Sequence, residues 1–400
     1  MDFPVTRFIQ SGPSGPGPVS RLRSWVGPLP LQQGLLFVGV LFLFVFLGQN
    51  TADSMHRMGL TPGFAFLSHQ ANFEIGESLL PYSAGDSYAR ALGAGIANTI
   101  KVAVIGCLLA TVLGVALGIA RLSGNLLLAT FVHTYVELLR NTPLLLQLFL
   151  WSAIIHALPP PRGAYTFLGS VYLSNRGVYL PSVSVEGLPA VAWLSVVVLA
   201  VLAALVLCRR LFAGSAFYLP KSAGAVLVAL ALCYLTLSSL GFAASVEIPA
   251  KGGFNIRGGL SLTPEFAALL IGLVVNASAS ISEIVRSGIQ SVKSGQWEAA
   301  RALGLKPGQI LRLVVLPQAL RVITPLMISS FLDLTKNSSL AVAIGYPDLV
   351  SVANTTANTT GQALEAIIII GAVYLTISLA VSAAMNLYNR RVVLRAEGKR

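Results

Sequence analysis

The chain has 400 residues, of which 55% are apolar and only 10% carry a charge. A soluble domain contains about 25% charged residues, so this chain has too little polar surface to cover a water-soluble globule. The composition excludes a cytosolic enzyme, a disordered chain and a secreted disulfide scaffold, and it predicts an all-α polytopic membrane protein.

The formal net charge is +12, from 27 basic and 15 acidic residues. Inner loops of membrane proteins are rich in Lys and Arg, which explains this excess. No basic run is interleaved with aromatic residues, so nucleic-acid binding is not predicted. The three cysteines and four histidines are scattered without CxxC or HExxH spacing. We therefore expect no metal site.

In chain order, the first 30 residues are rich in Gly, Pro and Ser and predict a flexible cytoplasmic tail (1–30). An apolar run at 31–48 follows. It predicts an additional N-terminal membrane anchor, because the residues after it do not resemble a signal-peptide cleavage site. A bilayer-spanning helix needs about 20 apolar residues. By this criterion we expect seven more spans, about eight in all, at roughly 98–120, 143–158, 188–208, 222–241, 265–285, 313–332 and 366–387.

The third span is preceded by an apolar run at 126–136, broken at Pro143. Proline removes a backbone donor and disfavours helix at the preceding residue. One long helix with a kink at Pro143 is therefore an alternative for this region. The basic residues of the connecting segments favour an even number of spans. That number places both termini in the cytoplasm.

The segment 286–321 is the most informative loop. Good helix formers run from Gln296 to Leu303, Gly304 follows where a helix stop is expected, and Pro307 lies just beyond. A short exposed helix in a cytoplasmic loop is either a docking element for a soluble partner or a plain connection between two spans.

The spacing of this segment resembles the EAA loop of ABC-importer permeases. Seven fixed positions carry the resemblance: Glu298, Ala299, Ala300, Gly304, Val314, Leu316 and Pro317. Only Val314, which stands where the family has Ile, departs from the pattern. The resemblance implies a coupling helix at 298–303 that docks in an ATP-hydrolysing subunit. It also implies that Gly304 provides the turn after this helix, where a side chain would oppose the turn.

Three further stretches resemble the polar amino-acid uptake permeases: 135–147, 283–288 and 336–340. Those permeases are about half this length, with a five-helix type I core. An enlarged permease is similar to the Q-type subunit of general L-amino-acid transport systems (the Aap/Bzt systems). The resemblance implies a permease membrane domain at 93–390, in which 157–262 is an inserted segment with two extra spans. It also implies a multi-pass protein of the bacterial inner membrane that carries L-amino acids.

The chain has no GxxxxGK[ST] loop to hold phosphates, so we do not expect it to hydrolyse ATP or to be an enzyme. The resemblance implies that a separate ATP-binding ABC subunit holds the ATP and Mg, and that this chain carries no cofactor. The other implied partners are a second related permease, a periplasmic amino-acid-binding protein and the lipid bilayer.

Polar residues within the spans are candidates for the substrate pathway, because a bare charge in the bilayer core is costly. Asn276, Ser280 and Glu283 share one helix face with Gly272, and such a stripe either lines a pathway or joins helices. The GxxxG of Gly114 and Gly118 favours helix packing.

Two further candidates lie near the third span. Arg140 either binds a substrate carboxylate or anchors a helix end. For Gln147, a role in the substrate pathway and a structural role are likewise both open. Asp333 and Lys336, three residues apart on the seventh span, either pair with each other or meet the binding protein.

Two other functional classes remain alternatives. An ion-gradient-driven amino-acid transporter predicts paired broken helices in inverted halves, and no such repeat is visible. A membrane-embedded enzyme predicts clustered acids or histidines at one membrane face, and the carboxylates are too few for that.

Overall fold

The computed structural model describes residues 30–57, 59, 63–185, 190–212, 218–239 and 244–397. The predicted tail lies outside these ranges except for its last residue. The chain divides into two units, Met1–Ala65 and Phe66–Arg400. In the first unit, α2 (Pro30–Arg57) covers the predicted anchor and extends beyond it.

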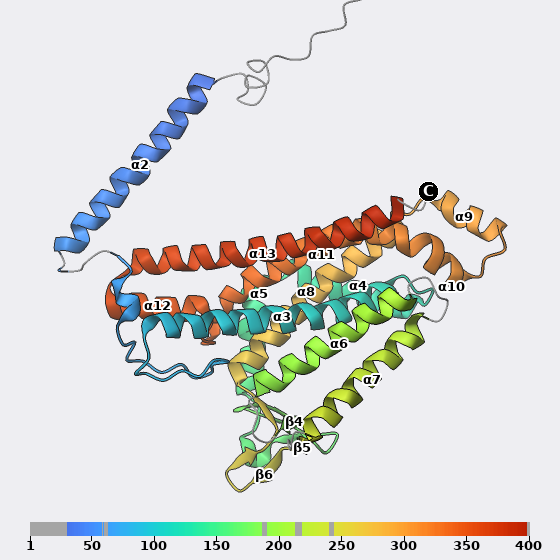
Figure 1. The fold of residues 1–400 in the computed structure, drawn as a ribbon, viewed down its shortest axis with the longest axis horizontal. Coiled ribbons are helices and arrows are strands. Elements are labelled where there is room, and N and C mark those ends of the chain that lie inside the picture. Colours follow the sequence, from blue (N-terminus) through green and yellow to red (C-terminus); the bar gives the residue numbers. More distant parts are fainter. Residues whose placement is uncertain are drawn as a thin grey trace, which may run out of the picture. The chain divides into compact units, whose positions relative to one another are not determined.

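The second unit is mainly helical (Figure 1). Its α-helices are α3 (Tyr88–Arg121), α4 (Leu126–Asn141), α5 (Leu144–His156), α6 (Ala190–Phe212), α7 (Tyr218–Ser239), α8 (Pro264–Gln290), α9 (Ser294–Ala302), α10 (Pro307–Ile310), α11 (Leu316–Asn337), α12 (Leu349–Thr360) and α13 (Ala363–Glu397). The shorter turns are the 3₁₀ helices η1 (Ala65–Ser68), η2 (Pro161–Gly163) and η4 (Ser338–Ile344) and the π-helical turn η3 (Leu311–Val315).

Among the described helices, five are long and apolar enough to cross a membrane, and the bent pair α4–α5 makes a sixth. Helices α6 and α7 stand at the predicted fourth and fifth spans, but their apolar stretches are shorter (Ser195–Cys208 and Gly224–Thr236). Each of the eight predicted spans therefore contains a helix. The membrane-protein fold class is confirmed. Of the eight predicted spans, six are long and apolar enough in the described residues to cross a membrane.

The break at Pro143 divides the third span into two helices bent by 107°. Thr142 has an extended backbone (φ −103°, ψ 129°), as a residue before proline prefers. The Gln147 side chain donates to the carbonyls of Leu139 and Thr142, each at 2.9 Å. It thereby satisfies acceptors that the break leaves without helical partners.

Helix α8 lies at the centre of the second unit, packed against α3, α4, α5 and α11. It begins at the N-cap Thr263, whose hydroxyl accepts from the Phe266 N–H at 3.2 Å, followed by Pro264 at the first helical position. The largest buried cluster gathers on this helix and includes Phe266, Leu273 and Ile281. Burial of apolar side chains such as these stabilises the packing in this region.

The predicted insertion, 157–262, carries strands that the sequence analysis did not predict. They are β1 (Tyr165–Phe167), β2 (Val171–Ser174), β3 (Gly177–Leu180), β4 (Ser182–Val185), β5 (Ala244–Glu247), β6 (Ala250–Gly252), β7 (Asn255–Arg257) and β8 (Leu260–Leu262). The order β1-β2-β3-β8 forms one antiparallel sheet, and β4-β5 and β6-β7 form two ribbons. Helices α6 and α7 pack side by side and join β4 to β5.

The strands are short, so their alternation is too brief to stand out among the spans. The helix α12 was also not predicted. It is capped by Asp348, whose carboxylate accepts from the Ser351 N–H at 2.8 Å. Because β8 leads directly into α8 and α9 follows it, the strands and α9 lie at opposite ends of α8 (Figure 1).

Candidate functional site

The loop between α8 and α10 presents the short helix α9, which covers most of the predicted coupling helix. Its buried side is small: Ala300 is 3% exposed, and Trp297 packs partly buried against the central cluster. Glu298 and Ala299 are exposed, and Leu303 is 80% exposed. An exposed leucine of this degree beside a short helix is an apolar contact that the described part of this chain does not cover.

Gly304 ends α9 in the left-handed conformation, with φ +73°. The Gly304 N–H donates to the Arg301 carbonyl at 2.9 Å, and the Leu305 N–H donates to the Ala300 carbonyl at 3.2 Å. This pair of bonds is a Schellman motif. A Cβ at position 304 would meet nothing within 4 Å. Glycine is therefore favoured here by its backbone conformation and not by crowding within this chain.

The last two residues of the EAA pattern, Leu316 and Pro317, start α11 and are exposed. Pro317 has no N–H and its ring opposes the carbonyl four residues earlier. The turn before it is π-helical, and the Leu316 N–H reaches back to the Leu311 carbonyl. Across the loop, the Gln318 side chain donates to the Gln296 side chain at 3.2 Å, which ties α11 to α9.

A cavity of about 410 Å³ lies along α8, facing α5 and α11. Asn276 and Ser280 line it, as does Ile284 one turn further on. Asp333 and Lys336 of α11 also line it, and both are exposed. Neither has an ion pair with a residue in the described ranges, so the two do not pair with each other. The cavity therefore presents one free carboxylate and one free ammonium among amide and hydroxyl groups.

The other pathway candidates lie elsewhere. Arg140 is exposed in the last turn of α4 and is not among the lining residues. Gln147 is 4% exposed and bridges the α4–α5 break. Gln147 therefore has a role in local structure, because both hydrogen bonds that its side-chain amide donates go to backbone carbonyls freed by the break.

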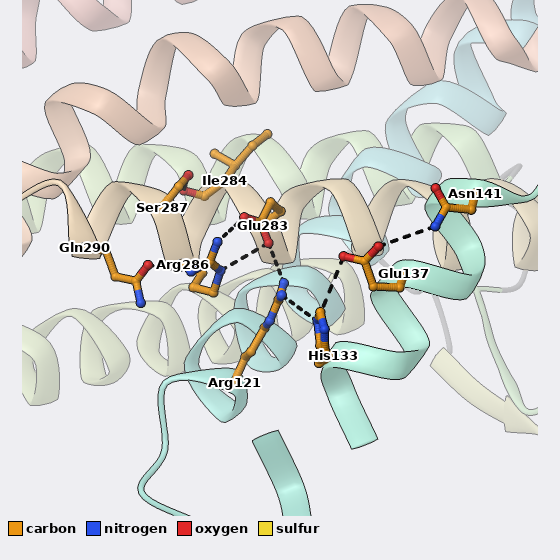
Figure 2. A network of polar contacts seen from close by, with 9 residues as sticks. All are labelled: Arg121, His133, Glu137, Asn141, Glu283, Ile284, Arg286, Ser287 and Gln290. Atoms are coloured by element: carbon orange, nitrogen blue, oxygen red, sulfur yellow. Dashed lines mark hydrogen bonds and ion pairs between the residues drawn. The ribbon is translucent and has the colours of Figure 1, made fainter. Parts of the chain in front are cut away.

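Glu283 does not line the cavity either. It lies in a polar network between the end of α3, the middle of α4 and the last turns of α8 (Figure 2). The Glu283 carboxylate makes ion pairs with Arg121 and Arg286. Arg286 continues to Gln290, the last residue of α8, while Arg121 also lies 2.7 Å from His133 Nδ1. Because a guanidinium can only donate, His133 Nδ1 is the acceptor in this contact.

Sequence reasoning did not find the role of Arg121, which lies 162 residues before Glu283. Locally, the sequence showed only that Arg121 stands at the end of a predicted span. Because the two residues are far apart in the chain, no sequence pattern indicated that Arg121 pairs with Glu283. In the described ranges, no group of three or more His, Cys, Asp or Glu side chains could hold a metal ion.

The chain matches the family model for the binding-protein-dependent transport system inner membrane component over residues 110–394. It is 44% identical over 384 residues to the putative amino-acid ABC transporter permease protein YhdX of Escherichia coli, covering 93% of this chain and 95% of that protein. It is 42% identical over 368 residues to the general L-amino acid transport system permease protein AapQ of Rhizobium johnstonii, covering 90% and 91%.

The chain is also similar to the glutamate/glutamine/aspartate/asparagine transport system permease protein BztB of Rhodobacter capsulatus. The two are 38% identical over 395 residues, covering 89% of this chain and 92% of that protein. These matches confirm the resemblance found in the EAA loop, and they extend through the segment that holds the strands and α6–α7. The chain belongs to the family of binding-protein-dependent transport system inner membrane components.

Proposed function

We propose that this chain is a membrane subunit of an ATP-driven importer that carries L-amino acids across the bacterial inner membrane. Its relatives are amino-acid transport permeases by name, which supports this substrate class. Both termini lie in the cytoplasm in this proposal, so α9 faces the cytoplasm and the strands face the periplasm. The permease domain spans 93–390, with 157–262 as the inserted segment.

The observation that carries the proposal is the free surface of α9 and its glycine stop. Glu298, Ala299 and Leu303 face away from the core, whereas Ala300 and Trp297 hold the helix to it. A separate ATP-binding subunit docks on this surface and holds the ATP and Mg. This chain transmits the motion and carries no cofactor of its own.

The cavity supports an amino-acid substrate. A zwitterion needs a cationic partner for its carboxylate and an anionic partner for its ammonium. Lys336 and Asp333 supply these charges, and Asn276 and Ser280 supply hydrogen-bonding groups. The volume lies within the range of small-molecule sites. A second related permease completes the pore, and a periplasmic binding protein delivers the substrate.

The test is uptake by the purified complex in proteoliposomes, with radiolabelled L-glutamate, L-leucine and L-arginine supplied together with the binding protein. We expect uptake to require ATP in the compartment that the ATP-binding subunits face. Uptake should persist when ionophores collapse the ion gradients. Uptake that follows an ion gradient without ATP would contradict the proposal. The family assignment already argues against the ion-driven transporter and the membrane-embedded enzyme.

Asp333→Asn and Lys336→Gln in the same assay should each raise the substrate KM about tenfold or more, because each leaves one charge of the substrate without a partner. Arg140→Gln is the matched control, since Arg140 lies outside the lining. An unchanged KM in both cavity variants would remove the cavity from the pathway.

A further inference from the structure

We propose that Glu283 is a positioning residue whose ion pairs with Arg121 and Arg286 make the last turns of α8 and the adjoining parts of α3 and α4 move as one body when α9 is displaced. We call these three residues the ionic latch. The inference rests on the proposed function, because it concerns how motion of α9 reaches the membrane helices.

The first support is the contact between α3 and α8 just beside the latch. A Cβ at Gly114 would lie 2.6 Å from the Ile281 Cβ, and a Cβ at Gly118 would lie 2.8 Å from the Val285 Cβ. The two helices thus approach until only glycine fits. The Arg121–Glu283 ion pair follows directly on this contact, so successive turns of α3 are attached to α8.

The second support is that the Glu283 carboxylate is fully engaged. Its Oε2 accepts from Arg121 Nη1 and, at 3.2 Å, from Arg286 Nε, while its Oε1 accepts from Arg286 Nη2. The Arg121 side chain is only 12% exposed. A pair of this kind is costly to break on one side, because the remaining charge is left partly buried and without a partner.

The third support is the continuity of the latch with its neighbours. Arg121 also contacts His133 of α4, and His133 lies 3.9 Å from Glu137. On the other side, Arg286 reaches Gln290 at the end of α8, and α9 begins at Ser294. The network therefore extends from α4 to the start of the loop that carries the coupling helix (Figure 2).

The opposite side of α8 borders the cavity along part of its length. Ile284 lies away from Arg121 across the helix (Figure 2), and it lines the cavity with Asn276 and Ser280. One face of α8 is thus attached by ion pairs and glycine contacts, whereas the other borders the cavity between the positions where Gly272 packs on Leu148 of α5 and Gly288 packs on Ile323 of α11.

The test measures amino-acid uptake and ATP hydrolysis in parallel, with the intact complex in proteoliposomes and the three radiolabelled amino acids named above. Glu283→Gln should keep ATP hydrolysis but lower the uptake per ATP hydrolysed about tenfold, an effect typical of lost coupling between sites. Arg121→Gln should act similarly. The double variant should be no worse than the worse single variant, because both remove the same interaction.

Ser287→Ala is the matched control. Ser287 lies one turn from Glu283 on α8, and its hydroxyl donates only to the Ile284 carbonyl of the same helix, at 3.2 Å. We expect an unchanged ratio. The proposal is overturned if Glu283→Gln keeps the normal uptake per ATP. It is equally overturned if uptake and hydrolysis fall together with the amount of complex, since that result indicates a purely structural role.

A second measurement does not depend on transport. Spin labels at Ser123→Cys, beyond α3, and Ser291→Cys, beyond α8, should keep their distance when the complex is trapped with ATP and vanadate. In Glu283→Gln the distance should broaden or shift. A distance that changes in the protein with an intact latch contradicts the proposal. Failure of the unmodified complex to show any ATP-dependent uptake would instead count against the proposed function.

Discussion

The α3–α8 contact and the turn after α9 both depend on glycine, for different reasons. At Gly118 a Cβ would collide with Val285, whereas at Gly304 a Cβ would meet nothing within 4 Å and only the backbone, at φ +73°, favours glycine. The first region is complete within this chain. The second is an exposed surface that ends in Leu303, and its energetic role depends on a partner. Substitutions should therefore harm mainly the chain itself in the first region and mainly the assembly in the second.

The largest effect is expected from Gly118→Leu. The side chain has no room against Val285, so overpacking by about 3 kcal/mol or more should prevent folded protein from accumulating. Membrane yield and thermal unfolding in detergent measure this. Gly124→Leu is the control, because a Cβ there meets nothing within 4 Å. Normal yield of Gly118→Leu would show that the two helices are not held as closely as described.

The next effect is expected from Leu303→Glu. The side chain is exposed, so the chain should fold normally. If the ATP-binding subunit covers it, loss of this apolar contact and burial of a charge should weaken docking by about 2 kcal/mol, or roughly 30-fold. Co-purification and binding affinity of the two subunits are the readouts. Unchanged affinity would exclude Leu303 from the interface.

The adjacent alanines of the EAA pattern separate the two kinds of effect within one motif. Ala300→Leu should destabilise the chain by about 2 kcal/mol, because Ala300 is buried against the central cluster. Ala299→Leu should leave the thermal unfolding temperature unchanged, since Ala299 is exposed, and should affect only docking. The opposite outcome would mean that α9 is rotated from its described orientation.

Among the variants that destabilise the chain itself, the smallest effect is expected at Gly304. Gly304→Val should cost about 1–2 kcal/mol, because a β-branched residue opposes the left-handed conformation. Gly304→Asn should cost less, since asparagine adopts this conformation more readily. Thermal unfolding ranks the two variants. If Gly304→Asn abolishes uptake while it leaves unfolding unchanged, the position contacts a partner. Equal unfolding of both variants and the native chain would show that the turn contributes nothing to stability.

Much of this organisation is readable from the residue order. Apolar segments of span length locate the membrane helices, because a bilayer has no water to satisfy an exposed backbone. The helix formers at 296–303 with Gly304 after them predict α9 and its stop, since these signals act within a few residues. Asn276 and Ser280 share a helix face by periodicity alone, and both line the cavity.

Tertiary structure decided what depends on residues far apart in the chain. Glu283 shares the periodicity of Asn276 and Ser280, yet its carboxylate is held by Arg121 of α3 and by Arg286. The charges of Asp333 and Lys336 stay free because the α8 residues that line the same cavity, such as Asn276 and Ser280, carry no charge. Strands β3 and β4 pair with β8 and β5 across α6 and α7, at separations that no local pattern records. Local spacing thus determined the helices, including α9 with its glycine stop, whereas packing between distant segments determined which polar groups pair and which remain available.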